Sequence, residues 1–154
     1  MIQEATIERV LDRLERGAED YESEIHDFAD SQPELMEYLT NEDTEAFTEA
    51  ERDLLLFAAV VIYQSVDDER AGIPEASGEA IARAEEHNYA IFQRGQAAPF
   101  RDRLTPFFEE SEEEELLAFV EDLLLAESDD ADRVSGEARE AFFVTLKTVV
   151  DVLT

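Results

Sequence analysis

The sequence has no cysteine, and this absence excludes disulfides, thiol nucleophiles and cysteine-ligated zinc or iron–sulfur sites. Tryptophan is absent too, and only two histidines, five glycines and four prolines occur among 154 residues. The motifs G-x-S-x-G, G-x-G-x-x-G, H-E-x-x-H and the P-loop are also missing. The sequence therefore assigns no catalytic residue, no metal ligand and no cofactor, and it favours a non-enzymatic role.

Basic residues are scarce as well. Twelve Lys and Arg oppose 41 Asp and Glu, which gives a net charge of −29, and Lys147 is the only lysine. Each third of the chain is net negative, so the acid is spread evenly. Such a surface repels itself at low salt, and molar salt screens the repulsion because the Debye length falls to about 3 Å. The composition resembles that of halophile proteins and predicts adaptation to a salty cytoplasm.

Long apolar runs are limited to one segment, Leu54 to Tyr63, with ten consecutive apolar or aromatic residues. This run is far shorter than the ~20 residues of a membrane span. The first residues, MIQEATIERVL, show neither a basic n-region nor a continuous apolar h-region. We therefore expect a cytoplasmic protein that does not interact with membranes.

The same apolar run predicts the centre of the fold. Thr48 and Glu51 have the spacing of a capping box, so a helix is expected to begin there and to reach Ser65 or Val66. A helix that is apolar on every side must be surrounded by others. We predict a single all-α domain over residues 1–154, a bundle of about seven helices around the fully buried helix 48–66.

The first thirty residues contain a regular heptad, the repeat that keeps one seam of a helix facing a partner. It passes through Gly17, which weakens a helix by about 1 kcal/mol relative to Ala. We predict one long helix over residues 2–30, packed within the chain; pairing of the seam between two copies is the alternative, so the protein is expected to be a monomer or a homodimer. The seam consists of Ile7, Leu11, Leu14, Ala18, Tyr21, Ile25 and Phe28.

Capping residues, glycines and prolines divide the rest of the chain. Ser31 is expected to cap a short helix, and Ser111 and Glu114 have capping-box spacing. Residues 67–76 are expected to form a loop. The further helices are predicted at Pro33–Leu39, Ser77–Arg94, a turn or two from Pro99 with a restart near Thr105, Ser111 to about Ala126, and Ser135 to the C-terminus.

The helix predicted at Ser77–Arg94 carries two polar residues on its apolar stripe. Asn88 falls in the middle of the stripe and His87 at its edge. A core amide bonded to its neighbours is one interpretation, because buried polar groups need partners. The other is a cavity into which Asn88 and His87 point.

The segment from His87 to Phe108 is the only net-positive stretch. Its arginines, Arg94, Arg101 and Arg103, alternate with phenylalanines such as Phe100. Arginine suits carboxylate or phosphate and stacks on aromatic rings, which favours an anion or partner site. An exposed site of this kind predicts that Arg101→Ala and Arg103→Ala change stability by no more than about 0.5 kcal/mol. The alternative is that these arginines form ion pairs with surrounding carboxylates and so fix this segment against the rest of the protein.

Three functions fit these patterns. The first is a non-enzymatic interaction or regulatory module adapted to high salt, whose protein partner contacts the basic segment. The second is an enzyme or small-anion-binding protein with a pocket near Asn88, His87 and Arg94. The third is an acidic mimic or chaperone for a basic partner, which would more often concentrate its charge in blocks. Nucleic acid is not an expected partner.

Overall fold

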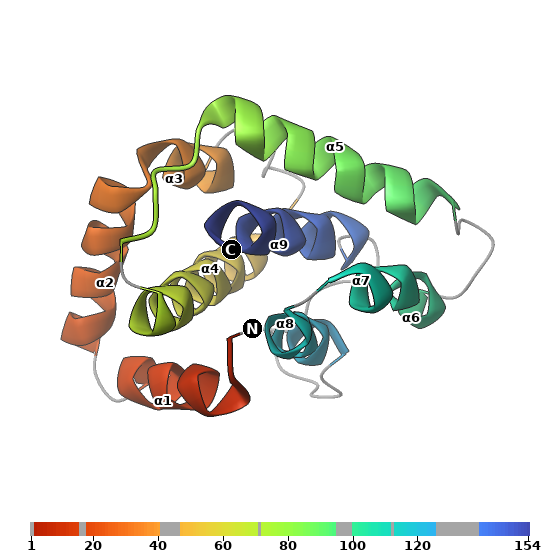
Figure 1. Cartoon of the computed structure of the whole chain (residues 1–154). Helices are drawn as coiled ribbons and strands as arrows, with labels where there is room; N and C mark the ends of the chain where they lie inside the picture. Colours follow the sequence, from red (N-terminus) through yellow and green to blue (C-terminus); the bar gives the residue numbers. More distant parts are fainter. Residues whose placement is uncertain are drawn as a thin grey trace.

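The computed structural model describes residues 2–15, 18–40, 47–70, 72–94, 100–111, 113–125 and 139–154, and over these ranges the protein is an all-helical bundle without strands (Figure 1). This arrangement confirms the predicted fold class. The helices are α1 (Glu4–Glu15), α2 (Ala18–Ser31), α3 (Pro33–Thr40), α4 (Glu49–Glu69), α5 (Gly78–Arg94), α6 (Phe100–Arg103), α7 (Thr105–Glu110), α8 (Glu114–Leu125) and α9 (Arg139–Leu153).

Helix α4 lies at the centre, as the apolar run predicts. Its capping box is complete: Glu51 N donates to Thr48 Oγ1 over 3.1 Å, and Thr48 N donates to Glu51 Oε1 over 2.8 Å. Every residue from Ala58 to Val66 is buried, but Leu54, Leu56 and Phe57 are only partly buried, so the prediction of a fully buried helix over residues 48–66 is wrong for its first half. The helix continues to Glu69, past the predicted end at Val66, so the loop that follows is shorter than expected.

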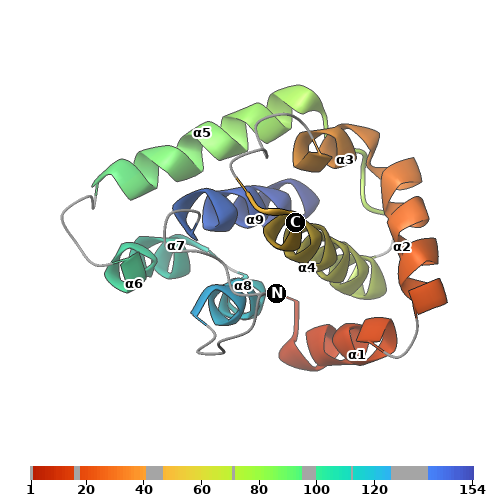
Figure 2. The same ribbon diagram turned by 180° about the vertical axis from the view of Figure 1, so that it is seen from behind.

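Helix α9 shares the centre with α4. All nine residues from Phe142 to Val150 are buried. Figures 1 and 2 show α4 and α9 in the middle of the molecule, with the other helices around them. Because α9 has neighbours on several sides, its polar residues Thr145, Lys147 and Thr148 are buried as well. The predicted start of this helix, at Ser135, lies outside the described residues.

The predicted single helix over residues 2–30 is wrong. The segment forms two helices, α1 and α2, whose axes run in clearly different directions (Figures 1 and 2). Gly17, which lies between them in the sequence, is outside the described residues. The physical reason for the change of direction is burial: a straight helix of this length would extend about 43 Å at 1.5 Å per residue, whereas α4 is only about 31 Å long. Both halves contact α4 instead.

Residues of the heptad seam pack against other helices of the same chain. Ile7, Leu14 and Phe28 are buried, and Phe28 contacts Tyr63 of α4 edge to face, with 5.2 Å between ring centroids. Leu11, Tyr21 and Ile25 are partly buried against the same core. These contacts favour the intramolecular interpretation of the seam over pairing between copies.

The starts of α3 and α5 agree with the predicted positions, but Ser31 is the last residue of α2 and does not cap α3, because Gln32 stands directly before Pro33. Helix α3 begins at Pro33, and Ala80 N donates to Ser77 Oγ at the start of α5. The Ser111–Glu114 capping box is not formed. Ser111 Oγ accepts a hydrogen bond from Glu113 N instead, and Leu117 N donates to Glu113 O. Helix α8 therefore begins at Glu114, three residues after the predicted start at Ser111, with Glu113 at the N-cap position.

Phenylalanines join three helices at one end of the core. Phe143 of α9 contacts Phe107 of α7 and Phe92 of α5, with centroid separations of 4.9 Å and 5.6 Å. Phe92 and Phe107 are 5.1 Å apart. This aromatic cluster fixes α5 and α7 against α9 and so determines the shape of the surface between them.

The acidic surface gives a direct prediction about salt. We expect the melting temperature to rise between low and molar KCl, because screening reduces the repulsion among evenly spread carboxylates. The measurement is thermal unfolding at several KCl concentrations. A variant in which the exposed Glu8, Glu22 and Glu86 are changed to Gln should show a weaker dependence on KCl. A melting temperature that stays flat or falls would contradict the adaptation to high salt.

Candidate functional site

The candidate site is built around Lys147, in the buried part of α9. Only 9% of its side chain is exposed, and its ammonium forms an ion pair with Asp151 one helical turn later. Among the described residues, this ammonium has one hydrogen-bond partner, Asp151. An ammonium carries three donors, and a buried charge is costly unless its donors find acceptors. Lys147 is therefore a cation with donors left to satisfy.

Asn88 of α5 donates a hydrogen bond to the other carboxylate oxygen of Asp151. Its Nδ2 donates to Asp151 Oδ2 over 3.1 Å and to Thr148 Oγ1 over 3.3 Å. Asn88 is completely buried, as its place in the apolar stripe predicts, and its Oδ1 has no hydrogen-bond partner in the described part of the chain. The Asp151 carboxylate thus accepts from both a lysine and an amide, which fixes its orientation.

A second polar contact joins Tyr38 of α3 to Glu85 of α5, next to this network. The Tyr38 hydroxyl donates to Glu85 Oε2. Burial raises the pKa of the Tyr38 phenol, and the neighbouring Glu85 carboxylate raises it further, while the Thr145 and Thr148 hydroxyls oppose the shift. Because the raised pKa keeps the phenol protonated at neutral pH, Tyr38 acts as a donor and adds no charge near the site.

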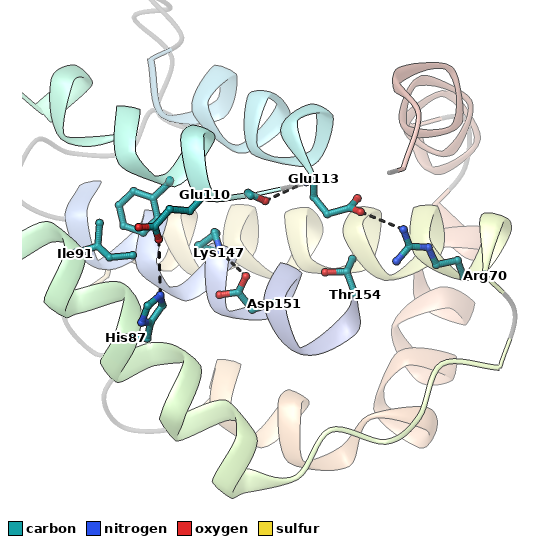
Figure 3. A pocket seen from close by; sticks show the side chains of 10 residues that line it. Arg70, His87, Ile91, Glu110, Glu113, Lys147, Asp151 and Thr154 are labelled. Carbon is teal, nitrogen blue, oxygen red and sulfur yellow. Dashed lines mark hydrogen bonds and ion pairs between the residues drawn. The ribbon is translucent and has the colours of Figure 1, made fainter.

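The Lys147–Asp151 pair faces a pocket of about 380 Å³ between α5, α7, α9 and the end of α4 (Figure 3). Ile91 and Phe107 supply its apolar wall. Two further charged pairs border it, and in the view of Figure 3 Lys147 and Asp151 lie between them. The full lining is Arg70, His87, Ile91, Phe107, Glu110, Ser111, Glu113, Lys147, Asp151 and Thr154.

Arg70 and Glu113 form one of these pairs. Arg70 Nη2 donates to Glu113 Oε1 over 3.2 Å, and the backbone N–H of Ile2 donates to Glu113 Oε2 over 2.9 Å. The Glu113 side chain is 7% exposed. This carboxylate is therefore held by the cation that follows α4 and by the backbone of Ile2.

His87 and Glu110 form the other pair. The His87 Nε2 and Glu110 Oε2 atoms are 4.0 Å apart, beyond hydrogen-bond distance, and 62% of the histidine side chain is exposed. The sequence analysis placed His87 at a cavity, and it does line this pocket. Asn88 does not line it, but it supports the lining residue Asp151 from behind.

The arginines of the basic segment have different surroundings. Arg94 is exposed at the end of α5 and is not part of the pocket lining. Arg103 points inward: its guanidinium carbon lies 4.7 Å from the centroid of the Phe92 ring, Nη2 donates to Phe92 O over 2.9 Å, and Nη1 contacts Glu140 at 3.4 Å. These contacts favour the structural interpretation for Arg103. The side chains of Phe100 and Arg101 lie outside the described part of the structure.

Sequence reasoning did not select Lys147, Asp151 or Arg70 as site residues. One signal was present: Lys147 is the only lysine, it occurs in an apolar helix, and it precedes an aspartate by four residues. Arg70 gave no comparable signal, because it was placed in a loop. The pocket brings these residues together only through the packing of α4 against α9.

The chemistry of this arrangement is that of charge recognition. Two basic and three acidic side chains face one cavity with a limited apolar wall. The described residues contain no group of three His, Asp or Glu side chains that could hold a metal ion. None of the helices within the described ranges is long and apolar enough to cross a membrane.

Comparisons with known proteins add no identification: no protein-family model, no curated protein and no solved structure matches this chain.

Proposed function

We propose that the protein is a non-enzymatic binding module that takes up a small molecule with an anionic group in the pocket beside Lys147. The observation that carries the proposal is the ammonium of Lys147. It is buried, it lines the cavity, and Asp151 satisfies only one of its three donors. An anionic oxygen from a ligand would satisfy the remaining donors with charge-assisted hydrogen bonds.

The electrostatic setting of the pocket supports this function. The whole chain carries a net charge of −29, and most of its surface repels anions. The pocket lining is close to balanced by comparison, because Arg70 and Lys147 oppose Glu110, Glu113 and Asp151. Glu113 and Asp151 are each neutralised by a neighbouring cation. Among the described residues Glu110 has no Lys or Arg partner, but its side chain is 57% exposed, so solvent screens its repulsion of an anion bound at Lys147.

The solvent in which the protein works is part of the proposal. We infer that this is a salt-rich cytoplasm, because each third of the chain is net negative and the carboxylates are not confined to one block, as an acidic mimic would more often have them. High salt weakens long-range attraction between ligand and protein. Binding then depends on short contacts inside the pocket, where screening is smaller than at the surface.

The test uses the fact that Lys147 is the only lysine. Selective isotopic labelling of lysine gives a single side-chain signal, and we expect acetate and inorganic phosphate, added at constant ionic strength, to shift this signal in a saturable way. Calorimetry should show that Lys147→Met removes binding. The control is Arg83→Met, which neutralises an exposed cation paired with Glu79 on α5, away from the pocket.

The outcomes separate clearly. A lysine signal that does not move, or that moves linearly with anion concentration, contradicts the proposal without any variant being made. Equal binding by wild type and folded Lys147→Met also contradicts it. Thermal unfolding of each variant verifies that a loss of binding is not a loss of structure.

A further inference from the structure

The three carboxylates that line the pocket, Glu110, Glu113 and Asp151, differ in the number of hydrogen bonds that they accept. Glu113 accepts hydrogen bonds from Ile2 N and Arg70, and Asp151 accepts from Asn88 and Lys147. Glu110 has only the contact with His87, at 4.0 Å, and no hydrogen bond among the described residues. Glu110 is therefore the one lining carboxylate that is ready to accept from a ligand.

Lys147 and Glu110 thus make opposite demands on whatever occupies the cavity. The ammonium requires acceptors, and the carboxylate requires donors. Figure 3 shows both side chains extending into the pocket, Lys147 from α9 and Glu110 from α7, with Ile91 of α5 beside them. A simple anion would satisfy Lys147 and be repelled by Glu110, and a simple cation would have the reverse effect.

On this basis, and assuming the proposed anion-binding function, we propose that the preferred ligand is a small zwitterion of the amino-acid class with an apolar side chain. Its carboxylate binds Lys147, its ammonium binds Glu110, and its side chain packs on Ile91 and Phe107. A volume of about 380 Å³ accommodates a molecule of this size. The two charged contacts are short and need no long-range attraction, which suits a highly screened solvent.

The experiment compares three probes of matched shape: leucine, isocaproate, which lacks the amino group, and isoamylamine, which lacks the carboxylate. Calorimetry at constant high ionic strength should give leucine the tightest binding, by about tenfold or more over each truncated probe, because each probe leaves one charged group of the pocket without its contact. Variants of the pocket residues then show which side chain binds the ligand's carboxylate and which binds its ammonium.

Glu110→Gln should reduce the affinity for leucine to that for isocaproate, and it should not weaken isocaproate binding, because it removes a carboxylate that repels this anion. Lys147→Met should reduce leucine binding to the level of isoamylamine. Glu109→Gln is the matched control, because it removes the same charge from the adjacent residue, which does not line this pocket. The exposed position of Glu110 means that the Glu110→Gln protein is expected to fold normally.

The two proposals fail in different ways. Isocaproate binding as tightly as leucine, with no effect of Glu110→Gln, overturns the zwitterion and leaves anion binding at Lys147 intact. No saturable response to leucine, isocaproate, acetate or phosphate overturns both. Leucine binding that is the same in Glu109→Gln and Glu110→Gln overturns the role of Glu110.

Discussion

Replacing Phe143 with alanine is expected to lower the free energy of unfolding by about 3–5 kcal/mol. The ring is completely buried in α9 and contacts the rings of Phe92 and Phe107 at centroid distances of 5.6 Å and 4.9 Å. Its removal leaves a cavity at the point where α5, α7 and α9 meet. Since a domain is typically stable by only about 5–15 kcal/mol, this single change removes a large fraction of the total.

Chemical denaturation of wild type and variant gives the measurement, and Phe108→Ala is the control. Phe108 follows the buried Phe107 on α7 but is itself only partly buried, so its truncation removes the same group with a smaller loss of packing. Equal losses in the two variants would show that the aromatic cluster is not the core of this end of the molecule.

Arg103→Met is expected to have the second large effect, a decrease of about 2–3 kcal/mol in the free energy of unfolding. The Arg103 side chain is 13% exposed and combines a hydrogen bond to the carbonyl of Phe92, an ion pair with Glu140 and a position over the Phe92 ring. The Phe92 carbonyl lies in the last turn of α5, at the negative end of the helix dipole. A guanidinium at this end donates a charge-assisted hydrogen bond to the carbonyl and complements the dipole.

Arg94→Met is the matched control for Arg103→Met. Arg94 belongs to the same basic segment but is exposed, so the substitution should change stability by less than about 0.5 kcal/mol. The sequence analysis expected that tolerance for Arg103 as well, on the assumption that the basic segment forms an exposed partner surface. Denaturation curves that coincide for the Arg103→Met and wild-type proteins would restore that interpretation for Arg103.

Much of the local structure was predictable because its causes act within one or two helical turns. The Thr48–Glu51 capping box and the apolar run after it determine α4, and Ser77 determines the start of α5. The burial of Asn88 also follows from its place in the stripe of α5. These features depend on neighbours three or four residues apart, which the sequence displays directly.

The tertiary structure decided the rest, because the relevant contacts join residues that are far apart in the chain. The heptad shows which residues of the first segment are buried, but the position of α4 decides that α1 and α2 take different directions. The sequence shows an apolar face on α9, whereas packing by α4, α5 and α8 buries every residue from Phe142 to Val150, Lys147 included. The candidate site has the same origin. Asn88 and Asp151 are separated by 63 positions, and Ile2 and Glu113 by 111, so only the packing of the helices places these charges around one pocket.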